Sequence, residues 1–165
     1  MPLPRTATPS AAIDWVPMDD AAFAAWFAQS LPAYAQSHVE DGKWSADEAL
    51  AKARAEHDAL LPQGLATPRH HFRLLRRGDE VLGHVWFAEI EEGGRRGAYV
   101  YDIEVRPAVR RQGVARRAFE LVEADARALG LAFIGLHVFG PNAGARQLYG
   151  RLGFVETNIV MRKEL

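Results

Sequence analysis

The chain has 165 residues, 48% of them hydrophobic and 25% charged, so it is long enough to bury one sizeable core and has the composition of an ordinary globular protein. Its 20 Lys and Arg residues nearly balance 21 Asp and Glu residues, and the net charge of -1 argues against a protein held mainly by nucleic-acid phosphates. Cysteine is absent, which excludes disulfides, thiolate metal sites and a cysteine nucleophile.

The first twelve residues contain three prolines and no hydrophobic period, which predicts a flexible tail. Residues 13–165 are expected to form a single domain. The N-terminus lacks the apolar core of a secretory signal, and the longest mostly apolar stretch, residues 129–139, is far shorter than a membrane span. We therefore expect a cytoplasmic protein without membrane contact.

The first half of the chain predicts a short strand and two helices. A strand over residues 13–16 precedes a helical segment that begins near Asp19, and Pro32 is expected to kink or split this helix. Large apolar residues recur in it at three- and four-residue spacing: Phe23, Trp26, Phe27 and Leu31. Ser45 is expected to cap a second helix that ends near Leu61.

After Pro68 the period changes to that of strands. Strands over residues 71–76, 81–90 and 98–105 are separated by short turns, which predicts an antiparallel meander. Within the third strand, Asp102 and Glu104 are expected to share one face, opposite the alternate residues. These alternate residues are Tyr99, Tyr101, Ile103 and Val105.

The last third of the chain predicts an amphipathic helix over residues 113–129, a strand over 133–138 and a short helix that begins at Asn142. The strand–helix–strand order implies a parallel pair of strands. Residues 154–162 predict a last strand or hairpin. The whole pattern indicates a mixed α/β fold with a central mixed sheet flanked by helices.

The most informative segment, residues 105–117, places a strand end, a loop and a helix start in sequence. Unpaired N–H groups and the dipole of a helix N-terminus attract anions, and Gly113 allows an oxyanion to approach the backbone closely. Four arginines at positions 110, 111, 116 and 117 add positive charge. The ordinary alternative is a solvated basic helix face. The spacing Arg110-x-x-Gly113-x-Ala115 favours phosphate binding, although the chain has neither a P-loop nor a dinucleotide glycine motif.

Residues 110–115 resemble the acetyl-CoA pyrophosphate loop of the GCN5-related N-acetyltransferases (GNAT). Residues 142–154 are similar to the second signature of that family, N-x-x-A-x-x-L-Y-x-x-x-G-F, and the two signatures stand in the family's order. Residues 60–71 also resemble a segment shared with a bacterial subgroup whose substrate is unassigned. The resemblance implies a GNAT-like acyl-CoA N-acyltransferase fold in which the two parallel strands splay apart.

The resemblance assigns cofactor-binding roles for acetyl-CoA. The backbone of Ile103 to Val105 would pair with the pantetheine arm, and Asn142 would contact the cofactor. The loop that would hold the pyrophosphate consists of Arg110, Arg111, Gln112, Gly113, Val114 and Ala115. No metal is implied.

The resemblance also implies a direct transfer, in which a neutral amine attacks the thioester. Tyr149 matches the family tyrosine near the sulfur, and a phenol with a pKa of about 10 can protonate the departing thiolate. For the base, Glu104 is the first candidate, acting through water. Asp102 is the alternative, unless it is a structural carboxylate paired with an arginine. His137 is the third, although a hydrogen-bonded buried histidine is the more ordinary interpretation.

The acceptor side is expected to lie near the first two helices. Tyr34 and Trp44 are the candidate substrate-binding residues, and Glu40 and Asp41 beside them would suit a cationic amine. The neighbouring residues His70 and His71 do not indicate a metal site, because adjacent residues in a strand point to opposite faces. No serine lies in a nucleophile elbow, which argues against a serine hydrolase.

Together these features predict an acetyl-CoA-dependent N-acetyltransferase that acts on a primary amine of a small molecule, peptide or protein. One alternative is a non-catalytic CoA-binding or regulatory module. A second is a nucleic-acid binder that uses the arginine cluster, which the charge balance disfavours. A homodimer is compatible with such folds.

Overall fold

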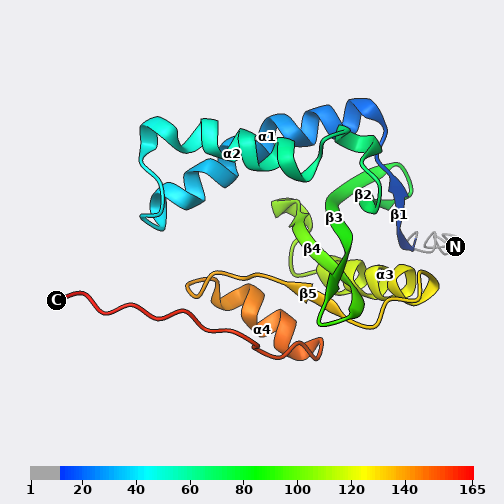
Figure 1. The fold of residues 1–165 in the computed structure, drawn as a ribbon. Helices are drawn as coiled ribbons and strands as arrows, with labels where there is room; N and C mark the ends of the chain where they lie inside the picture. The colour runs from blue at the N-terminus through cyan, green and yellow to red at the C-terminus, as the bar shows by residue number, and fades with distance from the viewer. Residues whose placement is uncertain (1–11) are drawn as a thin grey trace, which may run out of the picture.

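In the part of the chain that the structure describes, five strands form one sheet in the order β1-β2-β3-β4-β5 (Figure 1). The structure, a computed structural model, describes residues 12–165, so the predicted tail lies outside the described residues except for Ala12. The first four strands pair antiparallel, and β4 and β5 pair parallel. The strands are β1 (Ile13–Pro17), β2 (His70–Arg77), β3 (Glu80–Glu92), β4 (Arg95–Val105) and β5 (Ile134–Leu136).

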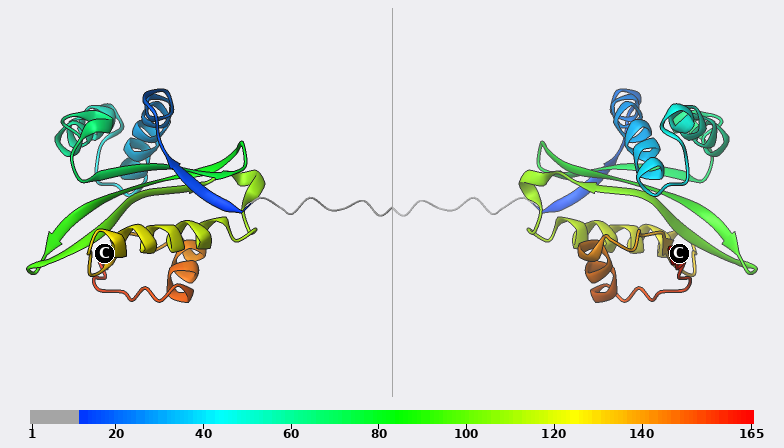
Figure 2. Two further views of the ribbon diagram at one scale, coloured as in Figure 1. Left: turned by 90° about the vertical axis from the view of Figure 1, so that its right-hand side faces the viewer. Right: turned by 90° about the vertical axis from the view of Figure 1, so that its left-hand side faces the viewer.

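Helices cover both faces of this sheet. Figure 2 shows α1 and α2 on one face and α3 and α4 on the other. The helices are α1 (Asp20–Glu40), α2 (Ala46–Leu60), α3 (Val114–Ala128) and α4 (Ala143–Arg151), with short 3-10 turns η1 (Gly64–Ala66) and η2 (Pro107–Val109). The predicted mixed α/β class is confirmed. In the described part of the chain, no helix combines the length and the apolar character that a membrane span requires.

Helix α1 runs without a break through Pro32, so the predicted split is wrong. A proline removes one helix hydrogen bond, but Pro32 is exposed, where water can hydrogen-bond to the freed carbonyl group. On either side of it, Leu31 and Ala35 are buried against Ala49 and Ala53 of α2. This packing holds both halves of α1 against α2.

The sheet separates two cores. On the α3 face, fully buried Phe87 and Val85 of β3 pack with Phe119 and Val122 of α3. On the α1 face, Trp26 packs on strand residues Phe72 and Trp86, with ring centroids 5.2 and 5.3 Å away. Because both faces of β3 are buried, the sequence of this strand is a nearly continuous apolar run.

A β-bulge in β4 changes which side chains share a face. The register with β3 shifts between Trp86 and Phe87, which pair with Asp102 and Val100, so Tyr101 is the extra residue. Tyr101 stacks on Trp86 at 4.7 Å on the α1 face, where Asp102 also lies. The predicted strict alternation, which put Asp102 opposite Tyr99 and Tyr101, is therefore wrong. Sequence period alone carries no sign of this inserted residue.

The two parallel strands diverge, as the resemblance implied. Pairing between β4 and β5 is limited to three residue pairs and ends at Val100 and Leu136, whereas β4 continues to Val105. Strand β5 is shorter than the predicted 133–138 for the same reason. The last five residues of β4 therefore have an unpaired edge on the β5 side.

The predicted last strand over residues 154–162 is not formed, so that prediction is wrong. The N–H of Phe154 donates to the carbonyl of Tyr149 at 3.0 Å, and beyond it the chain adopts no regular secondary structure. The apolar composition of this segment is strand-like, but a strand requires a neighbouring strand, and the segment does not lie against one here.

Gly83 is expected to be essential to the position of β4. A Cβ at this position would overlap the main-chain carbonyl of Glu104 across the ladder. Because backbone cannot move aside as a side chain does, Gly83→Ala should lower the free energy of unfolding by about 1–3 kcal/mol in a denaturant titration. Gly144→Ala in α4 is the matched control, since its Cβ meets open space. Equal stability of the two variants would contradict the expected overlap.

Candidate active site

A cavity of about 150 Å³ lies where β4 and β5 separate. Both strands and α4 contribute to it, so it is the slot that the diverging strands leave open. The lining residues are Val100, Tyr101, Asp102, Ile103, Leu136, His137 and Tyr149. Three residues predicted from the sequence to carry chemistry, Asp102, His137 and Tyr149, are thereby brought together from segments up to 47 positions apart in the sequence.

Asp102 is held by donors from two other elements. Trp26 Nε1–H of α1 donates to Asp102 Oδ2 at 2.8 Å, and His84 Nε2 of β3 makes a second hydrogen bond to the same oxygen at 2.8 Å. Burial disfavours the charged carboxylate, but the bonds from His84 and Trp26 and the Ile103 N–H outweigh it and lower the pKa of Asp102. The expected arginine partner is thus replaced by a histidine and a tryptophan.

Tyr149 faces the slot from α4. Its ring packs edge-on against Phe119 at 5.5 Å and lies 5.7 Å from Phe154, which fixes its orientation. Burial raises the pKa of the Tyr149 phenol, and the negative charge of Asp102 raises it further. The phenol is therefore protonated at neutral pH and has a proton to donate.

The other two base candidates lie differently. Glu104 is exposed and opposite His84 in the ladder; it is adjacent to Ile103 but does not line the slot. Its carboxylate has no hydrogen-bond or ion-pair partner within residues 12–165. His137 lines the slot, but it is exposed and packs edge-on against Phe139 at 4.9 Å, so it is not the buried histidine of the ordinary interpretation.

The loop before α3 has the geometry of an anion site. Arg111 and Gly113 adopt positive φ values of 63° and 78°, and Gly113 is the N-cap of α3 without a side-chain capping bond. The N–H groups of residues 111–115 find no acceptor among the residues that the structure describes. A Cβ on Gly113 would meet nothing within 4 Å, so the space in front of these donors is open.

The arginines around this loop divide into two groups. Arg116 and Arg117 both bond Glu120 at 3.2 Å, and Arg117 Nε–H also donates to the carbonyl of Ile13 at 3.0 Å. Arg110 Nε–H donates to the carbonyl of Val105 at 2.9 Å, which ties the loop to the end of β4. The prediction that all four arginines supply charge for phosphates thus fits Arg111 best, because its side chain is exposed and makes no ion pair with a described residue.

Gln112 is the uncharged polar side chain of the loop. Its Nε2–H lies 3.4 Å from the carbonyl of Ala108, a weak bond at an exposed position. Val114 is buried in the α3 core and Ala115 is half-buried, so these two residues offer their main chain rather than their side chains.

Asn142 begins α4, as predicted. Its Oδ1 accepts from the N–H of Ala145 at 3.1 Å, which leaves the amide NH₂ end available. Asn142 also lines a second cavity of about 440 Å³ between the end of α1 and the segment after β5. The other lining residues are Ser37, Glu40, Asp41, Phe139 and Pro141.

Tyr34 and Trp44 line neither cavity. The Tyr34 hydroxyl donates to Glu56 Oε2 at 2.7 Å, and burial together with this bond raises the pKa of Tyr34. Trp44 stacks on His38 at 4.1 Å. Both aromatic residues therefore join α1 to the chain that follows it, and their assignment to acceptor binding stays a prediction. Glu40 and Asp41 are the members of the predicted acceptor set that reach a cavity.

Sequence reasoning missed His84 and Trp26 as partners of Asp102. His84 lies two residues before Trp86, so both point to the same face, and a polar residue on a buried face requires a polar partner. This signal was present in the sequence. The identity of the partner was not, because Trp26 and Asp102 are separated by 76 positions.

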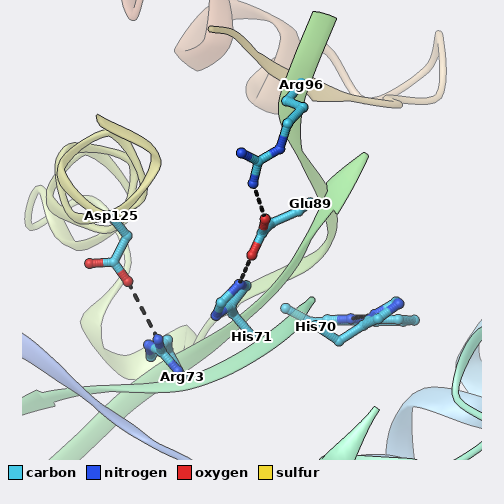
Figure 3. Close-up of polar contacts among 7 residues, drawn as sticks. His70, His71, Arg73, Glu89, Arg96 and Asp125 are labelled. Carbon is cyan, nitrogen blue, oxygen red and sulfur yellow. Dashed lines mark hydrogen bonds and ion pairs between the residues drawn. The ribbon is translucent and has the colours of Figure 1, made fainter. Parts of the chain in front are cut away.

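The two neighbouring histidines point apart, as predicted. His71 Nε2 forms a hydrogen bond with Glu89 at 3.2 Å, and Arg96 donates to Glu89 at 2.6 Å. The side chain of His70 points away from these three residues (Figure 3). On the other face, Trp86 Nε1–H donates to His70 Nδ1 at 2.9 Å. Across residues 12–165 no group of three potential His, Cys, Asp or Glu ligands surrounds a common point.

Comparison with known proteins identifies the same family as the motifs. The family model described as "Acetyltransferase (GNAT) family" matches residues 25–154. YycN of Bacillus subtilis (strain 168), named an uncharacterized N-acetyltransferase, is 33% identical over 150 residues, covering 90% of this chain and 96% of YycN. YdgE of the same organism, which carries the same description, is 30% identical over 149 residues, covering 90% and 95% of the two chains.

The fold agrees with these similarities. The crystal structure of YycN superposes with a TM-score of 0.86 at 32% identity, and the match covers 93% of this chain and 99% of that one. Three findings indicate the same family. They are the fold match at this identity, the family model over most of the chain, and the relatives named for one activity. The chain belongs to the acetyltransferase (GNAT) family and is an N-acetyltransferase.

Proposed function

We propose that the enzyme transfers the acetyl group of acetyl-CoA directly to a primary amine of a small molecule or peptide. The observation that carries this proposal is the position of an open set of N–H donors at the start of α3 beside a slot that contains a protonated Tyr149. The donors suit a pyrophosphate, and the slot suits a thioester.

The residues present fit acetyl-CoA. The N–H groups of Gln112 to Ala115, with the side chain of Arg111, would hold the pyrophosphate. The unpaired edge of β4 from Ile103 to Val105 would take the pantetheine arm as an added strand. When bound, acetyl-CoA supplies an activated acyl group, and the chain's own residues position it and move protons.

The proposed transfer balances with two proton movements. The amine loses a proton, its nitrogen forms a bond to the thioester carbon, and the carbon–sulfur bond breaks. Tyr149 gives its proton to the departing sulfur. We assign the base to Glu104, acting through water, because its carboxylate is exposed and unbonded among the described residues, whereas Asp102 Oδ2 already accepts two hydrogen bonds.

Asp102 has a positioning role in this proposal. It orients His84 and Trp26, and its charge favours the protonated form of Tyr149. A negative charge in the slot also attracts an ammonium group before it loses its proton.

The larger cavity is the proposed acceptor site. It adjoins the segment that leaves the slot at His137, and two of its lining residues, Glu40 and Asp41, are carboxylates. Among residues 12–165, Asp41 forms only a long ion pair with Lys43 at 3.5 Å, so its charge is largely free for a ligand. This arrangement favours amines that carry more than one positive charge.

Acetyl-CoA should stabilise the wild-type protein against thermal unfolding. At about 100 times its Kd the ligand adds about 2.7 kcal/mol, which is roughly 5–10 °C for a chain of this size. Gly113→Glu should abolish the shift, because it places a carboxylate in front of the loop donors. Gly130→Glu is the matched control at the other end of α3, where φ is also positive and the space is also open, and it should keep the shift. Equal shifts in both variants would refute the loop assignment.

Tyr149→Phe should lower kcat by about 10²-fold with little change in the KM for acetyl-CoA, since only the proton donor is removed. Tyr99→Phe, at a half-buried tyrosine outside the slot lining, should retain activity. An unchanged kcat in Tyr149→Phe would rule out this acid.

A general acid loses activity as pH rises through its pKa. Asp102→Asn removes the charge that raises the pKa of Tyr149, so the alkaline limb of the pH–rate profile should move to lower pH.

Replacing both cavity carboxylates, Glu40→Gln with Asp41→Asn, should raise the KM of a polyamine acceptor about fivefold or more, the effect of roughly 1 kcal/mol of lost attraction. The KM for acetyl-CoA should stay constant. The control is Asp47→Asn with Asp58→Asn, which makes the same change in net charge at exposed positions of α2. If both pairs raise the KM equally, the effect is one of overall charge and the cavity is not the acceptor site.

A further inference from the structure

The chain carries few side-chain amines of its own. Among its 20 Lys and Arg residues there are three lysines, Lys43, Lys52 and Lys163. Arginine keeps its proton in proteins and does not act as an amine nucleophile, whereas a lysine that loses its proton does. One of the three lysines, Lys43, lies beside the cavity proposed for the acceptor.

The ammonium group of Lys43 contacts two residues that line this cavity. Its Nζ lies 5.7 Å from the centroid of the Phe139 ring and 3.5 Å from Asp41 Oδ2. Both Phe139 and Asp41 belong to the cavity lining. An aromatic face and a carboxylate are the groups that attract an ammonium ion in a protein. Lys43 therefore makes, from within the chain, the contacts that a cationic acceptor would make in the cavity.

The main chain holds the base of the Lys43 side chain at the cavity. The N–H groups of Lys43 and Trp44 both donate to the carbonyl of His38, at 2.9 and 3.3 Å. These bonds fix the turn that follows α1, and Figure 1 shows this turn directly above the segment that follows β5. The Lys43 side chain itself is 50% exposed and has a flexible four-carbon stem, so its ammonium group can move along the cavity edge.

The contact with Phe139 leads from the cavity to the slot. His137 lines the slot and packs edge-on against Phe139 with ring centroids 4.9 Å apart. The Lys43 ammonium is thus separated by two side chains from the place where the thioester is proposed to bind. Asn142, the predicted cofactor contact, lies in the cavity lining as well.

We propose that Lys43 is a self-acetylation site, at which the enzyme acetylates its own side chain before it turns to external amines. This inference rests on the proposed use of acetyl-CoA. Lys43 Nζ loses a proton through water to Glu104, its nitrogen forms a bond to the thioester carbon, and the carbon–sulfur bond breaks. Tyr149 protonates the departing sulfur, as it would for an external amine.

Acetylation of Lys43 would change the charge of the acceptor cavity. The ammonium group becomes a neutral amide, so Asp41 loses its ion-pair partner and Phe139 loses its cation. Both groups are then available to an external ammonium ion, and the cavity becomes more negative. Self-acetylation is therefore expected to strengthen the binding of cationic acceptors.

Lys52 provides an internal comparison for this site. Its side chain is 45% exposed, close to the value for Lys43, and it also pairs with a carboxylate, Glu48, at 2.6 Å. Neither Lys52 nor Glu48 lines a cavity described above. Uncatalysed acetylation by a reactive thioester would modify two equally exposed lysines to a similar extent, whereas self-acetylation would select Lys43.

The first measurement is peptide mass spectrometry of the full chain after incubation with acetyl-CoA and no added amine. We expect one acetyl group on Lys43 that accumulates roughly tenfold faster or more than on Lys52, because a held amine has a high effective concentration. The rate constant should be the same at two protein concentrations, since the reaction stays within one chain. Tyr149→Phe and Gly113→Glu should slow the reaction at Lys43 and leave the slow background at Lys52 unchanged.

Equal acetylation of Lys43 and Lys52, or a rate constant that rises with protein concentration, overturns the proposal. A thermal shift with acetyl-CoA on the same sample separates the two possible failures. A protein that binds acetyl-CoA but leaves Lys43 unmodified refutes self-acetylation alone. A protein that shows neither binding nor modification refutes the proposed function as well.

The second measurement needs no acetyl-CoA and is the Kd of spermidine by titration calorimetry. Lys43→Gln has the neutral amide of the acetylated side chain and should lower this Kd roughly threefold or more, because Asp41 and Phe139 are free. Lys52→Gln makes the same change in net charge on α2 and should keep the wild-type Kd, as should Lys43→Arg, which retains the cation. Equal Kd values for Lys43→Gln and Lys52→Gln would show that Lys43 does not occupy the acceptor contacts, and would overturn the proposal.

Discussion

The separation of β4 from β5 is the constraint on which the site depends. Main-chain pairing ends at Val100 and Leu136, and the bulge at Tyr101 follows at once. Because the two features coincide, the free strand edge, the cavity and the Asp102 carboxylate lie in one place. Gly83 supports this arrangement from the opposite side, since only a residue without Cβ lets β3 approach the Glu104 carbonyl so closely.

One pair of residues sets the charge state of the slot. Hydrogen bonds from β3 and α1 keep Asp102 ionised despite its burial, and this charge combines with burial to keep Tyr149 protonated. The two pKa values are thus moved in opposite directions by a shared environment. A carboxylate that stays charged and a phenol that stays neutral can coexist here without exchanging a proton. This state suits the proposed role of Tyr149, which keeps its proton until the thiolate departs.

The parts of the structure that could be predicted from the sequence depend on local signals. Gly113 at a helix start and Asn142 as a cap act within one turn of their own positions, so their patterns were sufficient. The bonds from His84 and Trp26 to Asp102 join residues 18 and 76 positions apart, and no local pattern encodes them. The predictions of strict alternation in β4 and of a last strand over residues 154–162 are wrong for the same reason, because strand register and strand pairing are decided by a partner elsewhere in the sequence.

The two sides of the proposed reaction depend on different parts of the chain. In the proposal, the acetyl-CoA side would use main-chain groups of residues 103–105 and 111–115, and main-chain groups are available whatever side chains these positions carry. The proposed acceptor cavity is lined by side chains at the end of α1, and the Tyr34–Glu56 bond and the stack of His38 on Trp44 hold that end. We therefore expect Tyr34 and Trp44 to influence acceptor choice without touching the acceptor, because they hold the end of the helix that carries Glu40 and Asp41. Substitutions in this helix pair are expected to change the amine that is accepted while the cofactor loop remains the same.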